Sequence, residues 1–379
     1  MKKLEDIANS KRIGLNLKRI VISGFKSIKE IELPMRKINI LIGANGSGKS
    51  NLISVFAFLN NLSIGNLEKY VNNHGGADSF FHFGMNTTEK IVIDLTIGKN
   101  GYFVSLLPNH EKNALRFEKE FCTITSSSKV HPLTPSEFES GLPTSDDKDR
   151  VIMYTKRYLN NCRIYHFHDT SSNAEFKKKQ RLINDEDDKN IFLEKDAGNI
   201  APFLYLLKNG KREGYASSYK KIVSAIKVVA PFFKDFHLIK NGESVILKWK
   251  HSNNNSLSAD TLSDGTARFI CLATVILQPS SLRPGTIIFD EPELGLHPAA
   301  LAVLADLIQS TSDETQFICS TQSVTFANLF SPEDFIVVDA ESRGSTFRRL
   351  EKKPLIHWLD EFGVGDIWCK NLIGGRPAW

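Results

Sequence analysis

The spacing of apolar residues predicts alternating strands and helices along the chain. Residues 17–34 alternate between apolar and polar positions, as in strands with one buried face, and the apolar positions are Ile20, Ile22, Ile28, Ile31 and Leu33. The apolar run INILI at 38–42 predicts one more strand. Residues 51–62 then change to the three-and-four spacing of a helix, with one apolar face formed by Leu52, Val55, Phe56 and Leu59.

Further along the chain, residues 91–106 predict a hairpin around GKNG, and residues 236–250 predict a second hairpin. Helices are expected at 199–208, 217–233 and 299–310, and a buried strand at 286–289. The polar residues 124–150 predict a mobile surface loop, and 174–190 a solvated connection. We find no internal repeat and no long heptad pattern. Strands alternating with helices predict an α/β fold.

The sequence GANGSGKS at 43–50 lies between the predicted strand and the predicted helix and fits the pattern G-x-x-x-x-G-K-[ST] in full. Glycines in such a loop turn backbone N–H groups toward phosphates, and the helix N-terminus adds a positive dipole end. The motif predicts that Lys49 reaches the β- and γ-phosphates of a nucleotide and that Ser50 helps to hold Mg²⁺. The nucleotide-binding residues expected here are Gly43, Asn45, Gly46, Ser47, Gly48, Lys49, Ser50 and Asn51.

Two acidic residues follow the predicted strand in TIIFDEPELGLHP at 286–298. Strand ends are where ligands bind in α/β sheets. We expect Asp290 to hold Mg²⁺ through water and Glu291 to polarise the attacking water as a general base. The alternative is an ordinary strand end capped by two acids.

A second anion-binding turn is predicted at TLSDGTARF, 261–269, where Ser263, Asp264 and Gly265 precede an apolar helix. Taken alone, this stretch is a helix cap, because caps are several-fold more common than ligand sites.

The order of these motifs resembles the ATP-binding-cassette arrangement, and the chain resembles the SMC/RecF-like branch of those ATPases. The resemblance extends to compact AAA-type proteins related to the ATPase heads of OLD-type nucleases and anti-phage defence systems. It rests on GFKSI and GANGSGKSNL near the start, then LSDGT, IIFDEPELGLHP, ICSTQS and WLDEFGVGDIWCKNLIGGRP.

The resemblance implies a P-loop NTPase fold with a mixed central sheet and a helical lobe that carries the signature motif. Residues 1–84 and 261–350 would form the nucleotide-binding core of one head, 85–260 an inserted β-hairpin and helical lobe, and 351–379 a tail. Such heads pair: ATP on one subunit's loop is covered by the partner's Ser263, Asp264 and Gly265. The cofactors implied are ATP and Mg²⁺. The resemblance also places Lys26 in GFKSI near the nucleotide, and the alternative is a surface lysine in a turn.

Two positions depart from the family's pattern. Cassette ATPases carry a glutamine after the first helix, but residues 52–179 contain none. A backbone contact from 74–84, or His82, is a candidate substitute. Gln322 in ICSTQS stands where a switch histidine is expected, and glutamine cannot carry charge. We therefore expect slow hydrolysis, with Gln322 among the catalytic residues.

Other chemistry-bearing residues give weaker signals. His166 and His168, expected on one face of a strand beside Asp169, invite a metal site, but packing is the simpler interpretation. Trp358 is expected to pack on its own domain, while Trp368 and Trp379 are left open as interface or packing residues.

Composition limits the setting of the protein. Of the 379 residues, 41% are hydrophobic and 24% charged, which is typical of globular proteins. No run approaches the ~20 apolar residues of a membrane helix, and MKKLEDIANSKR lacks the apolar core of a secretory signal. Five cysteines without a C-x-x-C pair indicate reduced thiols in the cytoplasm. The net charge of +5 permits contact with an acidic polymer without requiring it.

The favoured function is a regulatory ATPase, an ATP-dependent homodimer or higher oligomer, that controls a separately encoded effector, a nuclease or toxin, in anti-phage defence. Residues 324–379 are too few for a Toprim nuclease domain of the kind that nuclease-bearing relatives carry. The alternative is a RecF-like ATPase of DNA repair or end recognition, for which basic residues are available at Lys177–Lys179, Lys220, Lys221 and Lys227. A transporter subunit and a scaffold that binds ATP without hydrolysing it are further alternatives.

Overall fold

The computed structural model describes residues 16–127, 129–171, 173–183 and 191–375. Two compact units divide the chain: one contains residues up to 164 with 285–288 and 316 onward, and the other contains 165–284 and 289–315. The sequence-based expectations for residues 1–12, 184–190 and Trp379 lie outside the described residues. The domain boundaries expected from the sequence stay a prediction.

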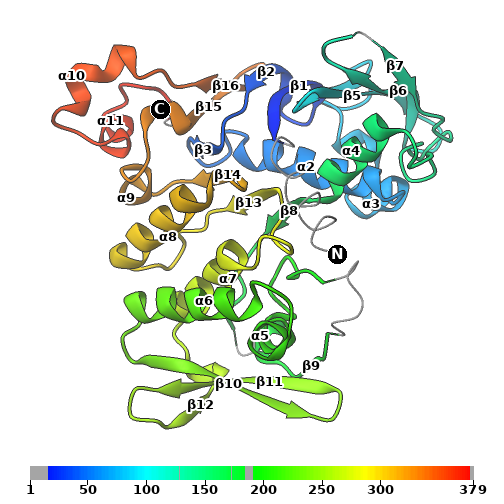
Figure 1. The fold of residues 1–379 in the computed structure, drawn as a ribbon. Helices are drawn as coiled ribbons and strands as arrows, with labels where there is room; N and C mark the ends of the chain where they lie inside the picture. The colour runs from blue at the N-terminus through cyan, green and yellow to red at the C-terminus, as the bar shows by residue number, and fades with distance from the viewer. Residues whose placement is uncertain (1–15, 128, 172, 184–190, 376–379) are drawn as a thin grey trace. The chain divides into compact units, whose positions relative to one another are not determined.

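An antiparallel sheet of six strands opens the first unit (Figure 1). In sheet order, its strands are β2 (Ile28–Pro34), β1 (Leu17–Phe25), β4 (Ile91–Ile97), β5 (Asn100–Asn109), β6 (Ala114–Ile124) and β7 (Val130–Pro132). The strands expected from alternation and the hairpin at 91–106 are confirmed. The turn between β4 and β5 is Gly98-Lys99, and Gly98 has the positive φ of 59° that tight hairpins favour.

A second six-stranded sheet carries the phosphate-loop strand. Its order is β16 (Gly344–Arg349), β15 (Phe335–Glu341), β3 (Ile38–Ile42), β14 (Gln316–Thr321), β13 (Thr286–Asp290) and β8 (Cys162–Tyr165). β3 runs parallel to both β14 and β15, whereas β16 is antiparallel to β15. β3 and β14 are buried at every position and β13 at every position but its last, so these strands show continuous burial rather than alternation.

The helices of the first unit are α2 (Lys49–Ser63), α3 (Leu67–Asn73), α4 (Arg150–Asn160), α9 (Val324–Ala327), α10 (Ile356–Leu359) and α11 (Val364–Cys369). α2 follows β3 and confirms the helix expected from residues 51–62. One hydrophobic core contains buried side chains from α2, from the antiparallel sheet and from the second sheet. Buried Gln316 also links β1 to β14: its amide accepts from the Leu17 N–H at 3.1 Å and donates to the Leu17 carbonyl at 2.9 Å.

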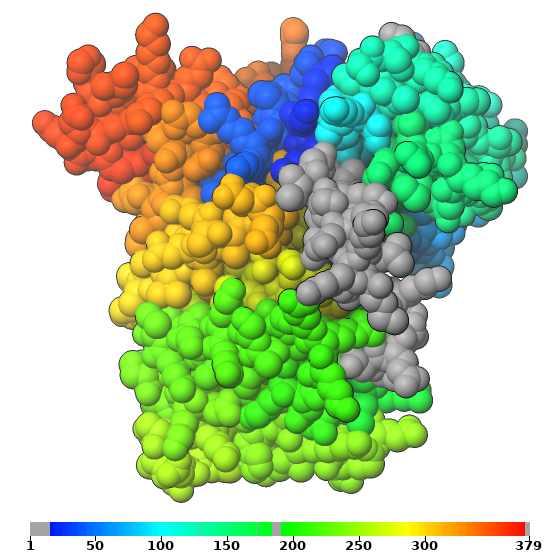
Figure 2. All heavy atoms as spheres, in the orientation of Figure 1, coloured from blue at the N-terminus to red at the C-terminus, as the bar shows by residue number. Residues whose placement is uncertain are grey.

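The second unit stacks helices on a small sheet. Its helices are α5 (Ile200–Asn209), α6 (Tyr215–Val229), α7 (Asp264–Leu277) and α8 (Pro298–Thr311), and its strands are β9 (Gln180–Arg181), β10 (Phe233–Asn241), β11 (Ser244–His251) and β12 (Ser256–Ser258). α6 packs against α5, α7 and α8, and both α5 and α6 contact the sheet. The space-filling view shows α6 and the small sheet as one continuous packed surface (Figure 2).

Several local expectations are wrong. α6 ends at Val229 rather than 233 because Pro231 restricts Ala230 to an extended conformation. Residues 124–150 are not simply a surface loop, because they contain β7 and the fully buried Leu142. Trp358 was expected to pack on its own domain but is 43% exposed, whereas Trp368 is buried.

Candidate nucleotide-binding and hydrolysis site

The glycine-rich loop between β3 and α2 surrounds the ammonium group of Lys49. This side chain is only 6% exposed, and its Nζ donates to the carbonyls of Gly43 at 2.7 Å and Ala44 at 2.9 Å. Asn45, Gly46 and Ser50 are exposed on the rim of the loop. The loop therefore holds a positive charge beside the first turn of α2, which adds its own positive dipole end.

The glycines of the loop are required by its geometry. Gly48, the residue before α2, has φ of 113°, and a Cβ there would lie 2.1 Å from the Ser345 hydroxyl. A Cβ on Gly43 would lie 2.3 Å from the Val338 carbonyl. Gly46 also has a positive φ, 76°, but nothing lies within 4 Å of the space a Cβ would fill. The loop is thus closely packed on the sheet and open at its tip.

A small hydrogen-bond network centred on Ser27 stabilises the base of the loop. The amide of Asn51 and the hydroxyl of Ser345 each donate to the hydroxyl of Ser27 at 2.7 Å. These residues come from α2, β16 and the β1–β2 turn, so the support joins segments 318 residues apart in the sequence. Asn51 was expected to bind the nucleotide, and it lies at the base of the loop.

Lys26 lies in the same β1–β2 turn with φ of 48°, a left-handed conformation that is uncommon for a residue with a side chain. Its ammonium lies over the Phe80 ring, 5.2 Å from the centroid, and burial lowers its pKa. The His82 ring donates to the Lys26 carbonyl at 2.7 Å and is 5% exposed. The turn that the sequence singled out therefore includes Ser27, to which Asn51 and Ser345 donate at the base of the phosphate loop. A contact of Lys26 with nucleotide stays a prediction.

Gln322 lies at the end of the strand next to the loop strand. It follows Thr321, the last residue of β14, and Thr321 is paired with Ile42, the residue before Gly43. The parallel pairing brings Gln322 to the same sheet edge as the loop.

The predicted acidic pair lies where expected, at the carboxyl end of β13. Asp290 is the last residue of the strand and Glu291 begins the following turn. Glu291 has φ of 48°, so the turn holds a catalytic candidate in left-handed backbone that costs about 1–2 kcal/mol. Such strained residues cluster at functional sites.

The signature stretch caps α7. The Ser263 hydroxyl accepts a hydrogen bond from the Thr266 N–H at 3.3 Å, so the helix-cap interpretation is confirmed as local structure. Ser263 and Asp264 are exposed, while nearly all of α7 behind them is buried. A Cβ on Gly265 would lie 2.6 Å from the Gly295 carbonyl, so the helix start is packed against the turn that follows Glu291.

Sequence reasoning missed Arg268, which is 7% exposed on α7. Its guanidinium donates to the backbone carbonyls of Phe167 at 2.7 Å, of His168 at 3.1 Å, and of Leu294. An arginine within the apolar helix pattern was the available signal, since a buried guanidinium requires fixed partners.

The histidine pair does not lie on a strand, because β8 ends at Tyr165. The two rings are nevertheless neighbours, with centroids 6.0 Å apart. Burial lowers the pKa of His166, while the Asp290 carboxylate acts in the opposite direction. Within the described residues, no group of three His, Cys, Asp or Glu side chains is arranged to hold a metal ion.

The residues around the loop fit a nucleoside triphosphate with Mg²⁺. The glycine loop offers a buried ammonium, an open tip and exposed backbone at a helix N-terminus, and the Ser47 hydroxyl is buried there without a hydrogen-bond partner. The exposed Ser50 hydroxyl is an oxygen donor of the kind that Mg²⁺ prefers. A strand, a glycine-rich loop and a helix with these contacts define a P-loop nucleotide-binding protein.

Comparison with known proteins gives the family. The model described as "AAA domain, putative AbiEii toxin, Type IV TA system" matches residues 38–328, and the chain belongs to this family. No curated protein matches the sequence.

Among solved structures, an Smc head bound to the C-winged helix domain of ScpA is similar over 89% of this chain and 99% of its own, with a TM-score of 0.55 and 16% identity. A Pyrococcus furiosus Smc head, bound to the C-terminal domain of ScpA, is similar over 91% and 98%, with a TM-score of 0.53 and 15% identity. The chain therefore has the fold of SMC ATPase heads, as the resemblance predicted. Within the part of the chain that the structure describes, no helix is long and apolar enough to cross a membrane.

Proposed function

We propose that this protein is an ATPase of the SMC-head type that binds Mg²⁺-ATP, pairs with a second copy of itself and hydrolyses ATP slowly. The observation that carries the proposal is the buried Lys49 ammonium inside the glycine loop at the start of α2. Membership of an AAA family and the SMC-head fold support nucleotide hydrolysis as the reaction.

Each candidate residue has a chemical role in this reaction. Lys49 and the loop N–H groups would contact the phosphates, while Ser50 and Asp290 would hold Mg²⁺. Glu291 accepts a proton from the attacking water as its oxygen bonds to the γ-phosphorus. The bond between that phosphorus and the β–γ bridging oxygen breaks, which gives ADP and phosphate.

Pairing is supported by the exposed signature stretch. Ser263 and Asp264 present a helix N-terminus to solvent on a rigid, buried helix, which suits a contact with phosphates held by another copy. ATP would then draw two heads together, and hydrolysis would release them.

Regulation of a separately encoded effector in anti-phage defence is the biological role we propose. The family's description refers to a toxin and a toxin–antitoxin system, and the similar Smc heads were solved with a protein partner. Gln322 in place of a charged switch residue suits a timer rather than a motor, and we expect a turnover of about one ATP per second or less.

The test is affinity purification of Glu291→Gln from its host, expressed with its flanking genes and with ATP present. A second protein in fixed ratio, released when ATP is removed, supports regulation of an effector. Recovery of nuclease-sensitive DNA alone, with pairing still dependent on ATP, favours the RecF-like alternative. A matched purification of Lys49→Ala should recover neither, because that variant lacks the phosphate-binding ammonium.

A further inference from the structure

A small cavity is lined both by the turn that begins at Glu291 and by the segment that follows β8. His168, Arg268, Asp290 and Glu291 line it, and apolar side chains that include Phe289 close the remainder. Its volume is ≈ 10 Å³, at the lower limit for holding one water molecule. A cavity of this size, lined in part by His168, Asp290 and Glu291, has room for no more than a single water molecule.

We propose that His168 contacts the water that attacks ATP, beside Glu291, and that Arg268 is the positioning residue that holds both in place. The inference rests on the proposed ATPase function. It deepens that function by giving His168 the role of the glutamine that cassette ATPases carry and that residues 52–179 lack. An imidazole, like an amide, can accept one hydrogen bond and donate another.

The sheet order places the two segments together. β8 and β13 are neighbours in the sheet, and the chain continues from each strand into this cavity. By contrast, the candidate expected from the sequence, His82, is buried in the first unit and uses its ring to support the Lys26 carbonyl. His168 is exposed, and the cavity wall includes it.

Arg268 fixes the backbone on both sides of the cavity. Two of its nitrogens hold the carbonyls of Phe167 and His168, and the third holds Leu294 in the turn after Glu291. Gly295 leaves room for the guanidinium, since a Cβ there would lie 2.6 Å from Nη1. Lysine cannot reproduce this planar fork, because its ammonium is a single point of charge.

The signature helix takes part in the same arrangement. Arg268 lies one and a half turns after Ser263 on α7, and Gly265 packs against the Gly295 carbonyl. The arginine therefore connects the catalytic turn with the surface that is proposed to meet the second copy.

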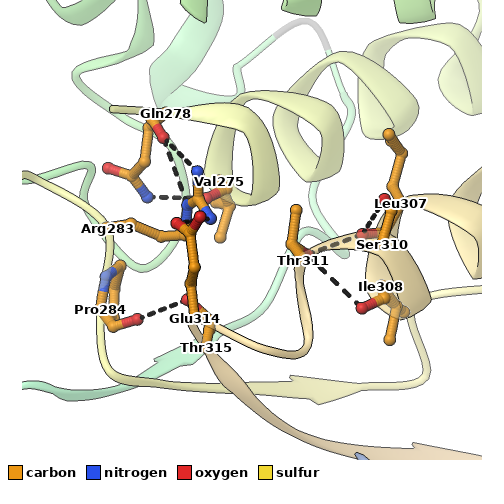
Figure 3. Close-up of polar contacts among 10 residues, drawn as sticks. All are labelled: Val275, Gln278, Arg283, Pro284, Leu307, Ile308, Ser310, Thr311, Glu314 and Thr315. Carbon is orange, nitrogen blue, oxygen red and sulfur yellow. Dashed lines mark hydrogen bonds and ion pairs between the residues drawn. The ribbon is translucent and has the colours of Figure 1, made fainter. Parts of the chain in front are cut away.

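The experiment compares His168→Ala, His168→Gln and Arg268→Lys with the wild type in steady-state ATP hydrolysis. ATP affinity is measured separately with a fluorescent ATP analogue. Arg283→Lys is the matched control, because Arg283 is also a largely buried arginine of the second unit. It donates to the Gln278 carbonyl at 3.0 Å and to Glu314 at 3.2 Å (Figure 3), and it does not line the cavity.

We expect His168→Ala to lower kcat about 100-fold with KM changed less than about threefold, the size of effect that positioned proton-transfer and charge-stabilising groups have. His168→Gln should recover most of that loss. Arg268→Lys should lower kcat in the same way, and Arg283→Lys should retain wild-type kcat. An unchanged kcat in His168→Ala, or a His168→Gln no better than alanine, overturns the inference.

A second readout does not depend on turnover. In the Glu291→Gln variant, ¹⁵N-labelled imidazole resonances should shift for His168 when ATP and Mg²⁺ are added, and Arg268→Lys should abolish that shift. An unmoved His168 resonance in protein that binds ATP also overturns the inference. Wild-type protein that binds ATP and never hydrolyses it would instead refute the proposed function.

Discussion

Two glycines of the phosphate loop differ in a way that allows a quantitative test of the packing. Gly46 and Gly48 both have positive φ, 76° and 113°. A Cβ on Gly46 meets nothing within 4 Å, whereas a Cβ on Gly48 meets Ser345 Oγ at 2.1 Å and Ser345 Cβ at 2.7 Å. Alanine at either position therefore carries the backbone cost, but only Gly48→Ala adds an overpacking cost.

The expected magnitudes follow from these two terms. Left-handed backbone costs a residue with a Cβ about 1–2 kcal/mol, and overpacking adds about 1–3 kcal/mol. Gly46→Ala should therefore lower the free energy of unfolding by about 1–2 kcal/mol, and Gly48→Ala by about 2–5 kcal/mol.

Urea unfolding followed by tryptophan fluorescence measures both variants, because the buried Trp368 lies in the same unit as the loop. The double variant Gly48→Ala with Ser345→Gly removes the clashing side chain and should recover the overpacking share. Equal destabilisation by the two alanine substitutions, or no recovery in the double variant, would refute this account of the loop.

Three further predictions concern the first unit. Glu120→Gln should lower the free energy of unfolding in urea by about 1–3 kcal/mol, because Glu120 accepts from Tyr102, Ser140 and Gly141 and an amide oxygen cannot replace both carboxylate oxygens. The control Glu137→Gln, at an exposed position, should change it by less than about 0.5 kcal/mol. Burial raises the pKa of Glu120, so protonation of its carboxyl favours the folded state. The free energy of unfolding should therefore fall as pH rises from the ordinary value of 4.5 through the folded pKa. If Glu120→Gln kept the same dependence of this free energy on pH, Glu120 would be excluded as its source. Asp149→Ala removes the helix cap of α4, which accepts from the Val151 and Ile152 N–H groups, and should lower the free energy of unfolding by about 1 kcal/mol, seen as a lower thermal midpoint. Asp149→Asn keeps a capping oxygen and should retain most of that free energy.

Local patterns predicted much of the fold. The runs that became β3, β13 and α2, and the alternation that became β1 and β4, are determined by spacing within a few residues of sequence. The phosphate-loop motif predicted its own strand–loop–helix setting, because the loop requires both neighbours.

Contacts between distant segments could not be predicted in the same way. The hydrogen bond from Ser345 to Ser27 joins residues 318 positions apart in the sequence, and the hydrogen bond from Arg268 to the Phe167 carbonyl joins residues 101 positions apart. The 124–150 stretch has a polar composition, yet Glu120 holds its residues Ser140 and Gly141 against the sheet. Only the tertiary partner shows that these polar groups are buried.

The central claim, that ATP joins two copies and that hydrolysis releases them, is tested most directly by native mass measurement of Glu291→Gln with and without Mg²⁺-ATP. The account predicts a monomer without nucleotide and twice that mass with ATP, and a monomer under both conditions when Lys49→Ala is added. Protein that keeps one mass in every condition while binding ATP would contradict the claim.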